Sequence, residues 1–379
     1  MRIALLTRRF DPHGGGTERD LIITAESLCA GGHEVSIFAR EVRGESADFK
    51  VKRVGGLALG RTAGLLSFAY AAPTAARSAG SELVVSFART IGADVMRSGG
   101  SAHISYLRAA RQWRSPLQWQ AMRISPYHRA QVFIERRAFA SPRLKGAIAV
   151  SNLVRDDLMR EFRLSGLKVV TLYNGVEVER FTPSTDDAAR REIRSALAIA
   201  DEAPIVVFVG NGFGRKGLRF LLEAWPKVAR GAHLMVVGAD RKVRWYQREA
   251  MRLGVGPRVH FAGAMPDVTQ VFRGVEAAAL PSLFEPFGNV VMEAMASGLP
   301  VLTTAQSGAS ELLSDPMQRF VVRDPTNADE IAGKMNALLE ADGDLRRVAR
   351  ATAERYTWQR YADNLLGIIS AIAAGRPVA

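Results

Sequence analysis

Two glutamates, Glu285 and Glu293, lie with seven residues between them in the stretch SLFEPFGNVVMEAMASGLPVL at positions 282–302. A carboxylate accepts two hydrogen bonds and a vicinal diol donates two, so each acid is suited to a sugar. Pro286 suits the first position of a helix, which predicts Glu285 at or just before the N-cap and Glu293 about two turns later. Between the acids lie amides that a helix leaves unpaired at its start: Gly288, Asn289 and Val290. Glutamates at this spacing also occur on ordinary helix surfaces, but a charge among the apolar neighbours of Glu293 needs a partner.

A second cluster with possible chemistry is the basic, glycine-rich loop in VGNGFGRKGLRFLLEAW, positions 209–225. Arg215 and Lys216 precede a predicted helix, whose free amides and dipole favour an anion together with the two cations. Three glycines of this loop allow close approach of the backbone to a ligand: Gly210, Gly212 and Gly214. The loop therefore predicts a diphosphate site, although many Arg-Lys pairs are simply solvated.

The third cluster is FDPHGGGTERD at positions 10–20, which follows the first predicted strand. Gly14, Gly15 and Gly16 allow close approach of the backbone to a ligand, and a helix is expected from about Thr17. The alternative is a flexible turn capped by Thr17. The stretch has neither the G-x-G-x-x-G spacing of a dinucleotide site nor the P-loop pattern, so NAD is not indicated.

These loops connect short β-branched runs and amphipathic helical runs that alternate along the chain, a pattern typical of βαβ units and parallel sheets. Expected first-half strands include positions 2–7, 34–39, 83–88, 93–98 and 146–151, with helices at 17–30 and 152–162. A second series has strands at 204–209, 233–238, 258–262, 277–281, 300–304 and 319–322, and helices at 218–229, 243–253 and 287–296, two more, and a last one at about 356–373. We expect an α/β protein with two Rossmann-like domains, residues 1–172 and 173–355, and a C-terminal segment, 356–379.

Composition narrows the functional class. The 379 residues are 47% hydrophobic and 23% charged, as in a globular protein, and the single cysteine, Cys29, excludes an intrachain disulfide. No apolar run reaches the about 18 residues of a membrane span, so a cytoplasmic location is expected. Residues 1–170 carry 26 Lys and Arg against 14 Asp and Glu, whereas residues 171–379 carry 25 against 24. The excess charge of the first half predicts an anionic partner for that domain alone.

Taken together, these residues resemble the retaining glycosyltransferases of the GT-B fold, family 4. The pattern E-P-F-G-x-x-x-x-E-A-M-A-x-G-x-P-V is specific for that family and occurs here without a gap. The resemblance also includes the N-terminal glycine loop, the R-K-G loop, the Y-N-G-V linker and a final helix that crosses back to the first domain.

The resemblance implies a role for each matching residue. Glu293 would hold the ribose of a nucleotide sugar, and Glu285 the transferred sugar near its reacting carbon. Arg215 and Lys216 would neutralise the diphosphate, which Gly15 and Gly16 would approach from the first domain. Further donor contacts are expected from the segment that links the two acids: Phe287, Gly288, Asn289 and Val290. Neither a metal nor another cofactor is expected, since the cations and the helix dipole stabilise the leaving group.

The family resemblance also points to His103, which follows a first-half strand where many relatives keep a histidine near the acceptor. It could hydrogen-bond the donor sugar or the attacking hydroxyl, while a structural role is an equal alternative.

Residues 103–145 carry nine Lys and Arg and one acid, with six aromatic residues interleaved. Such a segment is attracted to an anionic membrane surface, although an ordinary solvated helical face has the same composition. The run RISPYHRAQVFIERRAF also resembles the lipopolysaccharide core glucosyltransferases, whereas an extra glycine and Glu18 in the first loop depart from that subgroup.

We therefore expect a hexosyltransferase at the inner face of the cytoplasmic membrane, using UDP-glucose and a lipid-linked or lipopolysaccharide-core acceptor. A transferase with a soluble small-molecule acceptor is the alternative. A basic nucleic-acid-binding protein is a remote one, because no recognisable nucleic-acid module accompanies the charge.

Overall fold

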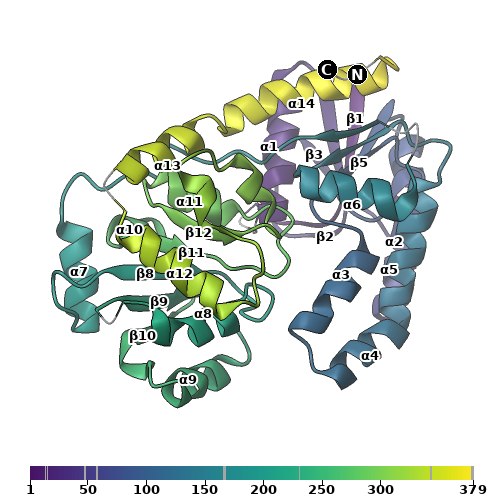
Figure 1. Cartoon of the computed structure of the whole chain (residues 1–379). Helices are drawn as coiled ribbons and strands as arrows, with labels where there is room; N and C mark the ends of the chain where they lie inside the picture. Colours follow the sequence, from purple (N-terminus) through teal and green to yellow (C-terminus); the bar gives the residue numbers. More distant parts are fainter. Residues whose placement is uncertain are drawn as a thin grey trace. The chain divides into compact units, whose positions relative to one another are not determined.

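The computed structural model describes residues 1–12, 14, 16–46, 48–56, 59–164, 168–229, 231–341 and 344–376, and for Thr17 and Lys168 only the backbone. The chain forms two compact units: unit 1 comprises Met1–Gly175 and Trp358–Ala379, and unit 2 comprises Val176–Thr357. The first unit boundary thus follows position 175, against an expected boundary after 172. Each unit is a parallel sheet with helices, which confirms the predicted α/β class (Figure 1).

In the described part of unit 1, seven parallel strands pair in the order β3-β2-β1-β4-β5-β6-β7. Their bounds are β1 (Arg2–Phe10), β2 (Glu34–Val42), β3 (Lys50–Arg53), β4 (Leu83–Ser86), β5 (Val95–Ser98), β6 (Gly146–Ala149) and β7 (Lys168–Thr171). The central strands are buried along most of their length, as their apolar runs predict. The edge strands β3 and β7 were not predicted from the sequence, because each is short and begins with a lysine.

The helices of unit 1 are α1 (Gly16–Ala30), α2 (Gly60–Ser78), α3 (His103–Ala109), α4 (Pro116–Ile124), α5 (Pro126–Phe139), α6 (Asn152–Phe162) and α14 (Trp358–Ala373). The start of α6 agrees with its sequence signal, since the Ser151 hydroxyl accepts a hydrogen bond from the Val154 amide. The α2 helix was missed: it is rich in alanine and contains Pro73.

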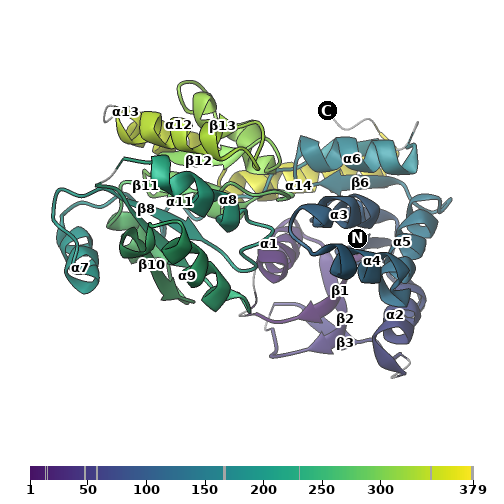
Figure 2. The same cartoon turned by 60° about the horizontal axis from the view of Figure 1, so that its bottom comes forward.

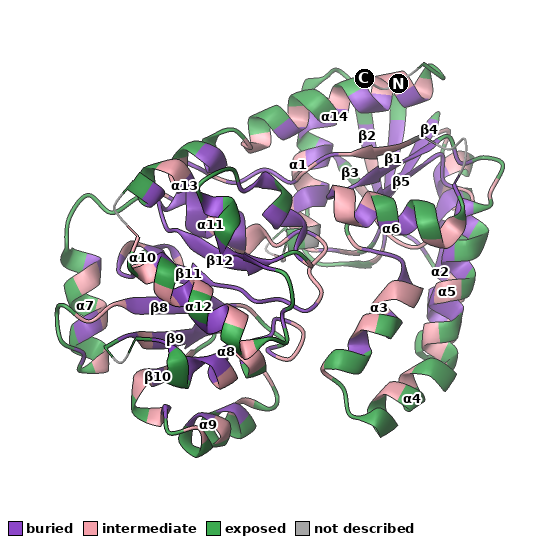
Figure 3. Ribbon diagram, in the orientation of Figure 1, coloured by how far each residue is buried: buried purple, intermediate pink, exposed green. Residues whose placement is uncertain are grey.

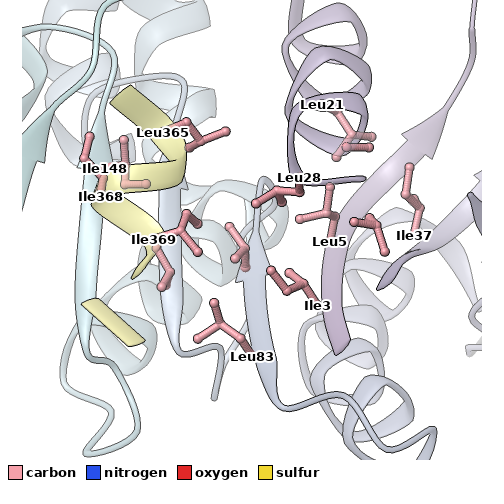
Figure 4. Close-up of a cluster of buried hydrophobic side chains, with 14 of the residues drawn as sticks. Ile3, Leu5, Leu21, Leu28, Ile37, Leu83, Ile148, Leu365, Ile368 and Ile369 are labelled. Atoms are coloured by element: carbon pink, nitrogen blue, oxygen red, sulfur yellow. The ribbon is translucent and has the colours of Figure 1, made fainter. Parts of the chain in front are cut away.

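The C-terminal helix α14 packs on unit 1, as predicted. Its apolar face joins the core of the sheet and α1, where Leu365, Ile368 and Ile369 lie among the strand residues (Figure 4). Buried polar groups add a specific link: the Tyr361 hydroxyl donates to Asp20 of α1 at 2.7 Å, and Asp20 lies 3.3 Å from the buried guanidinium of Arg97.

Unit 2 contains a six-stranded parallel sheet in its described part, in the order β10-β9-β8-β11-β12-β13. Its strands are β8 (Ile205–Val209), β9 (His233–Val237), β10 (Val259–Gly263), β11 (Ala277–Ala279), β12 (Val301–Thr304) and β13 (Val321–Val322). Its helices are α7 (Ala188–Leu197), α8 (Leu218–Ala224), α9 (Val243–Arg252), α10 (Thr269–Arg273), α11 (Asn289–Ala296), α12 (Ala328–Leu339) and α13 (Asp344–Glu354).

Three predicted elements of unit 2 are corrected by the structure. The helix expected at 218–229 ends at Ala224 and gives way to a 3-10 turn that contains Pro226, which cannot continue the helical hydrogen bonds. The strand expected at 319–322 is only Val321–Val322, because the buried Met317 and Phe320 belong to a 3-10 turn instead. The helix expected from 287 starts at Asn289.

No helix of the described chain is long and apolar enough to cross a membrane. Both sheets are largely buried, whereas α4 contains no buried residue (Figure 3).

Candidate functional site

Three of the residues predicted to bind a nucleotide sugar gather at the carboxyl ends of two neighbouring strands of unit 2. Arg215 and Lys216 lie between β8 and α8, and Glu285 lies between β11 and α11. Because β8 and β11 pair in parallel, their following loops meet at the same edge of the sheet. This pairing brings together side chains about 70 positions apart in the chain.

Hydrogen bonds join these three side chains. Glu285 Oε2 accepts from Arg215 Nη1 at 2.9 Å and from Lys216 Nζ at 2.8 Å. Arg215 Nη1 also donates to the Phe284 carbonyl at 2.7 Å, which fixes the guanidinium against the loop. The Lys216 and Glu285 side chains are 10% and 14% exposed, and that of Arg215 is 29% exposed, so Arg215 is the most accessible member.

The electrostatics of this trio keep Glu285 ionised. Burial by itself would raise the pKa of Glu285, but the charges of Lys216 and Arg215 outweigh burial and lower it. Two cations and one carboxylate leave a net charge of +1 at the sheet edge. The trio can therefore still attract an anion, while Glu285 keeps acceptor oxygens for hydroxyl groups.

The predicted relation between Glu285 and the following helix was wrong. Pro286 is not the first helical residue: α11 begins at Asn289, and Gly288 is its N-cap. Glu285 instead forms an isolated parallel bridge with Ser307, in the loop after β12. Its amide donates to the Gln306 carbonyl, so this loop, rather than α11, holds the Glu285 backbone.

Gly288 explains why the helix starts late. Its φ of 101° is a conformation that residues with a Cβ rarely adopt. A Cβ at this position would lie 2.9 Å from Ser307 Oγ and 3.2 Å from Glu285 Cγ. The glycine thus allows the chain to turn tightly beside the acid.

The other residues predicted to contact the donor lie in and before α11. Phe287 is buried, and its carbonyl accepts from Ser307 Oγ and the Ala309 amide, so it supports the loop from the core side. Glu293 is half-buried, as are Asn289 and Val290 in the first turn.

Sequence reasoning missed residues that brace the basic loop. Asp240, after β9, accepts from the Phe213 amide at 2.8 Å, and Asn211 accepts from the Ala239 amide at 2.7 Å. Gly217 has φ 78°, and a Cβ there would lie 1.9 Å from the Pro281 carbonyl oxygen. From the sequence, Gly217 of the R-K-G motif could have been recognised as a required glycine. In contrast, no local sequence signal indicates that Asp240 holds the basic loop.

The predicted residues of the first half lie in unit 1. Gly16 is the first residue of α1, and Gly15 lies outside the described residues. His103 is buried at the start of α3, where its backbone amide donates to Glu135 Oε2 and its Nε2 lies 2.9 Å from His128 Nδ1. Burial, and then Arg89 and His128, lower the pKa of His103 to about 3. Its imidazole is therefore neutral near pH 7.

The basic segment 103–145 forms α3, α4 and α5. A cavity of about 330 Å³ lies among these helices, with four arginines around an apolar lining: Arg108, Arg123, Arg129 and Arg136 around Ile104, Leu107, Trp119, Val132 and Phe133. On α4, Leu117 is 79% exposed and Ile124 74% exposed. The segment thus presents large apolar side chains beside cations.

Comparison with known proteins identifies the class of protein. The family model Glycosyl transferases group 1 matches residues 189–355, and the model Glycosyltransferase Family 4 matches residues 14–180. Together the two models span most of both units, and the chain belongs to this glycosyltransferase family. The predicted family is confirmed.

Particular relatives are more distant. An uncharacterised glycosyltransferase of Methanocaldococcus jannaschii is 26% identical over 229 residues, and the match spans 58% of each chain. The lipopolysaccharide glucosyltransferase WaaG of Escherichia coli is 24% identical over 339 residues, which is 87% of each chain.

Solved structures show the fold. The crystal structure of WaaG, described as a glycosyltransferase involved in lipopolysaccharide biosynthesis, superposes with a TM-score of 0.77 at 22% identity, covering 97% of this chain and 99% of that one. Anabaena HepE in complex with UDP-glucose gives a TM-score of 0.71 at 18% identity, covering 98% and 100%. The GT-B fold predicted from the sequence is confirmed.

Proposed function

We propose that this chain is a retaining glycosyltransferase that moves glucose from UDP-glucose to a lipid-linked acceptor such as a lipopolysaccharide core. The observation that carries the proposal is the trio of Arg215, Lys216 and Glu285 at one sheet edge of unit 2. Two cations suit a diphosphate, and an ionised carboxylate beside them suits the hydroxyls of the sugar attached to it. The HepE structure, which holds UDP-glucose, supports this donor class.

The geometry suggests how each group would act. Arg215, the most accessible of the three, would bind the diphosphate together with Lys216, and Glu285 would hold the sugar. As the bond between the anomeric carbon and the phosphate oxygen breaks, the cations would stabilise the negative charge that develops on UDP. The acceptor oxygen would form its bond on the same face of the sugar, and its proton would pass to the departing phosphate.

The donor is tested directly by a thermal-shift screen across nucleotide sugars, followed by product analysis. UDP and UDP-glucose should raise the melting temperature, and the product should retain the anomeric configuration. An inverted product, or no stabilisation by any nucleotide sugar, would contradict the proposal.

The acceptor proposal rests on the basic segment. The exposed Leu117 and Ile124 on α4, together with the arginines of α4 and α5, suit the interface of an anionic membrane. Similarity to WaaG over 87% of the chain supports a lipopolysaccharide-type acceptor, and with it a location at the inner membrane face.

The alternative is a soluble acceptor, and co-sedimentation with anionic liposomes separates the two. Binding at low salt that is lost in Leu117→Ser/Ile124→Ser supports the membrane proposal. No binding at low salt would favour the soluble acceptor, and a gel shift at moderate salt tests the remote nucleic-acid alternative.

A further inference from the structure

A second cavity, which has a more polar lining and is hereafter called the unit 1 cavity, lies at the carboxyl ends of β1, β4 and β5. It has a volume of about 610 Å³, and strands and loops line it together with α5. Ligands of open α/β sheets bind at such strand ends. The described residues that line it all belong to unit 1.

One face of α5 supplies a polar stripe to this cavity. Tyr127, Gln131 and Glu135 are spaced four residues apart, which places them one above another on a helix, and all three line the cavity. Glu135 is already engaged: its carboxylate accepts from Arg89 Nε at 2.6 Å and from the His103 amide at 2.8 Å. Tyr127 and Gln131 are the members of the stripe that remain for a ligand.

Gln131 is the strongest sign of a ligand. The residue is only 8% exposed, and within the described chain no group hydrogen-bonds its side-chain amide. The side-chain amide atoms of Gln131 are not among the fully enclosed polar atoms of the described chain, so they face the open space of the cavity. Because Gln131 lines the cavity, a bound ligand would satisfy it.

The acids of the cavity are placed beside other arginines. Glu18 accepts from Arg9 at 2.8 Å, and Glu41 neighbours Arg9 across the β1–β2 pair. These acids therefore neutralise Arg9 rather than Arg8.

Arg8 and Arg61 have no acidic partner within salt-bridge distance among the described residues. Arg8 Nη1 donates to the Tyr127 hydroxyl at 3.2 Å, and the Arg61 guanidinium lies 4.8 Å from the centre of the same ring. Arg61 is the second residue of α2, which packs beside α5 (Figure 2), and it adjoins the cavity through Tyr127 rather than as a lining residue. Both arginines are exposed, so water screens their repulsion, and an anion bound beside Tyr127 would be attracted by both.

The pKa of the neighbouring histidine is affected by positive charge at the same place. His128 follows Tyr127 on α5, and its pKa is lowered by burial and then by Arg61 and Arg114. Tyr127 accepts from Arg8, so its own hydroxyl proton can still be donated to a ligand.

We propose that the unit 1 cavity binds the acceptor through an oxyanion, the phosphate or carboxylate of an acidic sugar, held by Arg8 and Arg61 and bonded by Tyr127 and Gln131. The acceptor assignment rests on the proposed function, whereas oxyanion binding itself does not. The subsite makes an acidic sugar the acceptor class and excludes a neutral one as the preferred substrate.

Isothermal titration calorimetry at low ionic strength tests the subsite with glucose 6-phosphate, glucuronate and glucose as probes. At least one of the acidic probes should bind about tenfold more tightly than glucose. Arg8→Gln and Arg61→Gln should each weaken that binding by about tenfold, and Gln131→Leu by a smaller factor.

Arg155→Gln is the control, because it removes one partly exposed arginine from α6 that does not line the cavity. Its affinity for the probe should stay within about twofold of wild type. Equal weakening by Arg155→Gln and Arg8→Gln, or equal affinity for glucose and both acidic probes, overturns the proposal.

The failure of this inference is distinguishable from failure of the proposed function. If UDP binds the same samples but the acidic probes show no preference, only the subsite is wrong. If the acidic probes bind and UDP does not, the subsite stands and the donor assignment fails. Competition with detergent-dispersed lipopolysaccharide identifies the source: displacement of the probe supports a lipid-linked acidic sugar, and no displacement supports a free one.

Discussion

The two units each place a pair of cations at the carboxyl edge of a parallel sheet, but they neutralise them differently. In unit 2, Arg215 and Lys216 share the carboxylate of Glu285. In unit 1, Arg8 and Arg61 share the ring and hydroxyl of Tyr127, which carries no charge.

The difference shows what each pair can do without a ligand. A carboxylate between two cations is held rigidly in one position, which suits an acid that must contact a particular hydroxyl. Among the described residues, no acid lies within salt-bridge distance of Arg8 or Arg61, so these exposed cations can pair with an incoming anion. Unit 2 thus has a positioned acid, and unit 1 has an unsatisfied cationic cluster.

Among the variants that test this comparison, Glu285→Gln has the largest expected effect. The amide keeps the size of the side chain but frees both cations, making the unit 2 cluster resemble that of unit 1. Transfer should fall by about 100-fold, since a positioned group near the reacting carbon is lost. UDP affinity should stay the same or increase, as measured by calorimetry. Transfer at the wild-type rate would show that Glu285 has no role in the reaction.

His103→Asn tests the buried imidazole of unit 1. The pKa of His103 is about 3 in the folded chain, against about 6.5 in the unfolded one, so folding opposes its protonation. This histidine's contribution is therefore fully present above about pH 6.5 and is lost as the pH falls, by about 2 kcal/mol at pH 5. Urea unfolding at pH 7 and pH 5 should show a smaller acid-induced loss in the variant. If wild type and variant lost equal stability between pH 7 and pH 5, protonation of His103 would not contribute to the acid-induced loss.

Lys216→Met removes one of the cations that Glu285 joins. UDP should bind about tenfold more weakly, because a charge-assisted contact to the diphosphate is lost. Lys242→Met is the control: Lys242 is an exposed lysine of the same unit in the loop after β9, and its loss should change UDP affinity less than about twofold. Equal losses in the two variants would mean that overall charge, rather than this position, attracts the nucleotide.

The smallest effect concerns the backbone that turns beside Glu285. Gly288→Ala and Gly254→Ala both introduce a Cβ at positive φ, 101° and 71°, but the new Cβ at 254 meets nothing within 4 Å. Thermal or urea unfolding should therefore show Gly288→Ala to be less stable than Gly254→Ala by about 1 kcal/mol, since its Cβ also presses on Ser307 and Glu285. Equal stabilities would mean that this turn has room for a side chain.

Much of the fold could be predicted because local signals and burial agree. The apolar run of β1 is buried on both faces, and Ser151 caps α6 at the predicted position. The prediction failed where the local signal is weak or interrupted. The β3 strand has alternating lysines, α2 contains a proline, and the predicted helix after Glu285 needed a glycine turn before it could start.

By itself, the sequence determined the residue types of the candidate site: the acids and cations stand on strand-to-helix loops, and the motif that contains them is specific to a family. Only the tertiary structure decided their partners. Strand pairing brings Lys216 to Glu285, and the packing of α5 places Gln131, which has no hydrogen-bond partner among the described residues, in the cavity that Arg8 also lines. The physical reason is that charge and hydrogen bonding depend on distance through space, and the distances between loops are set by the order of strands in each sheet.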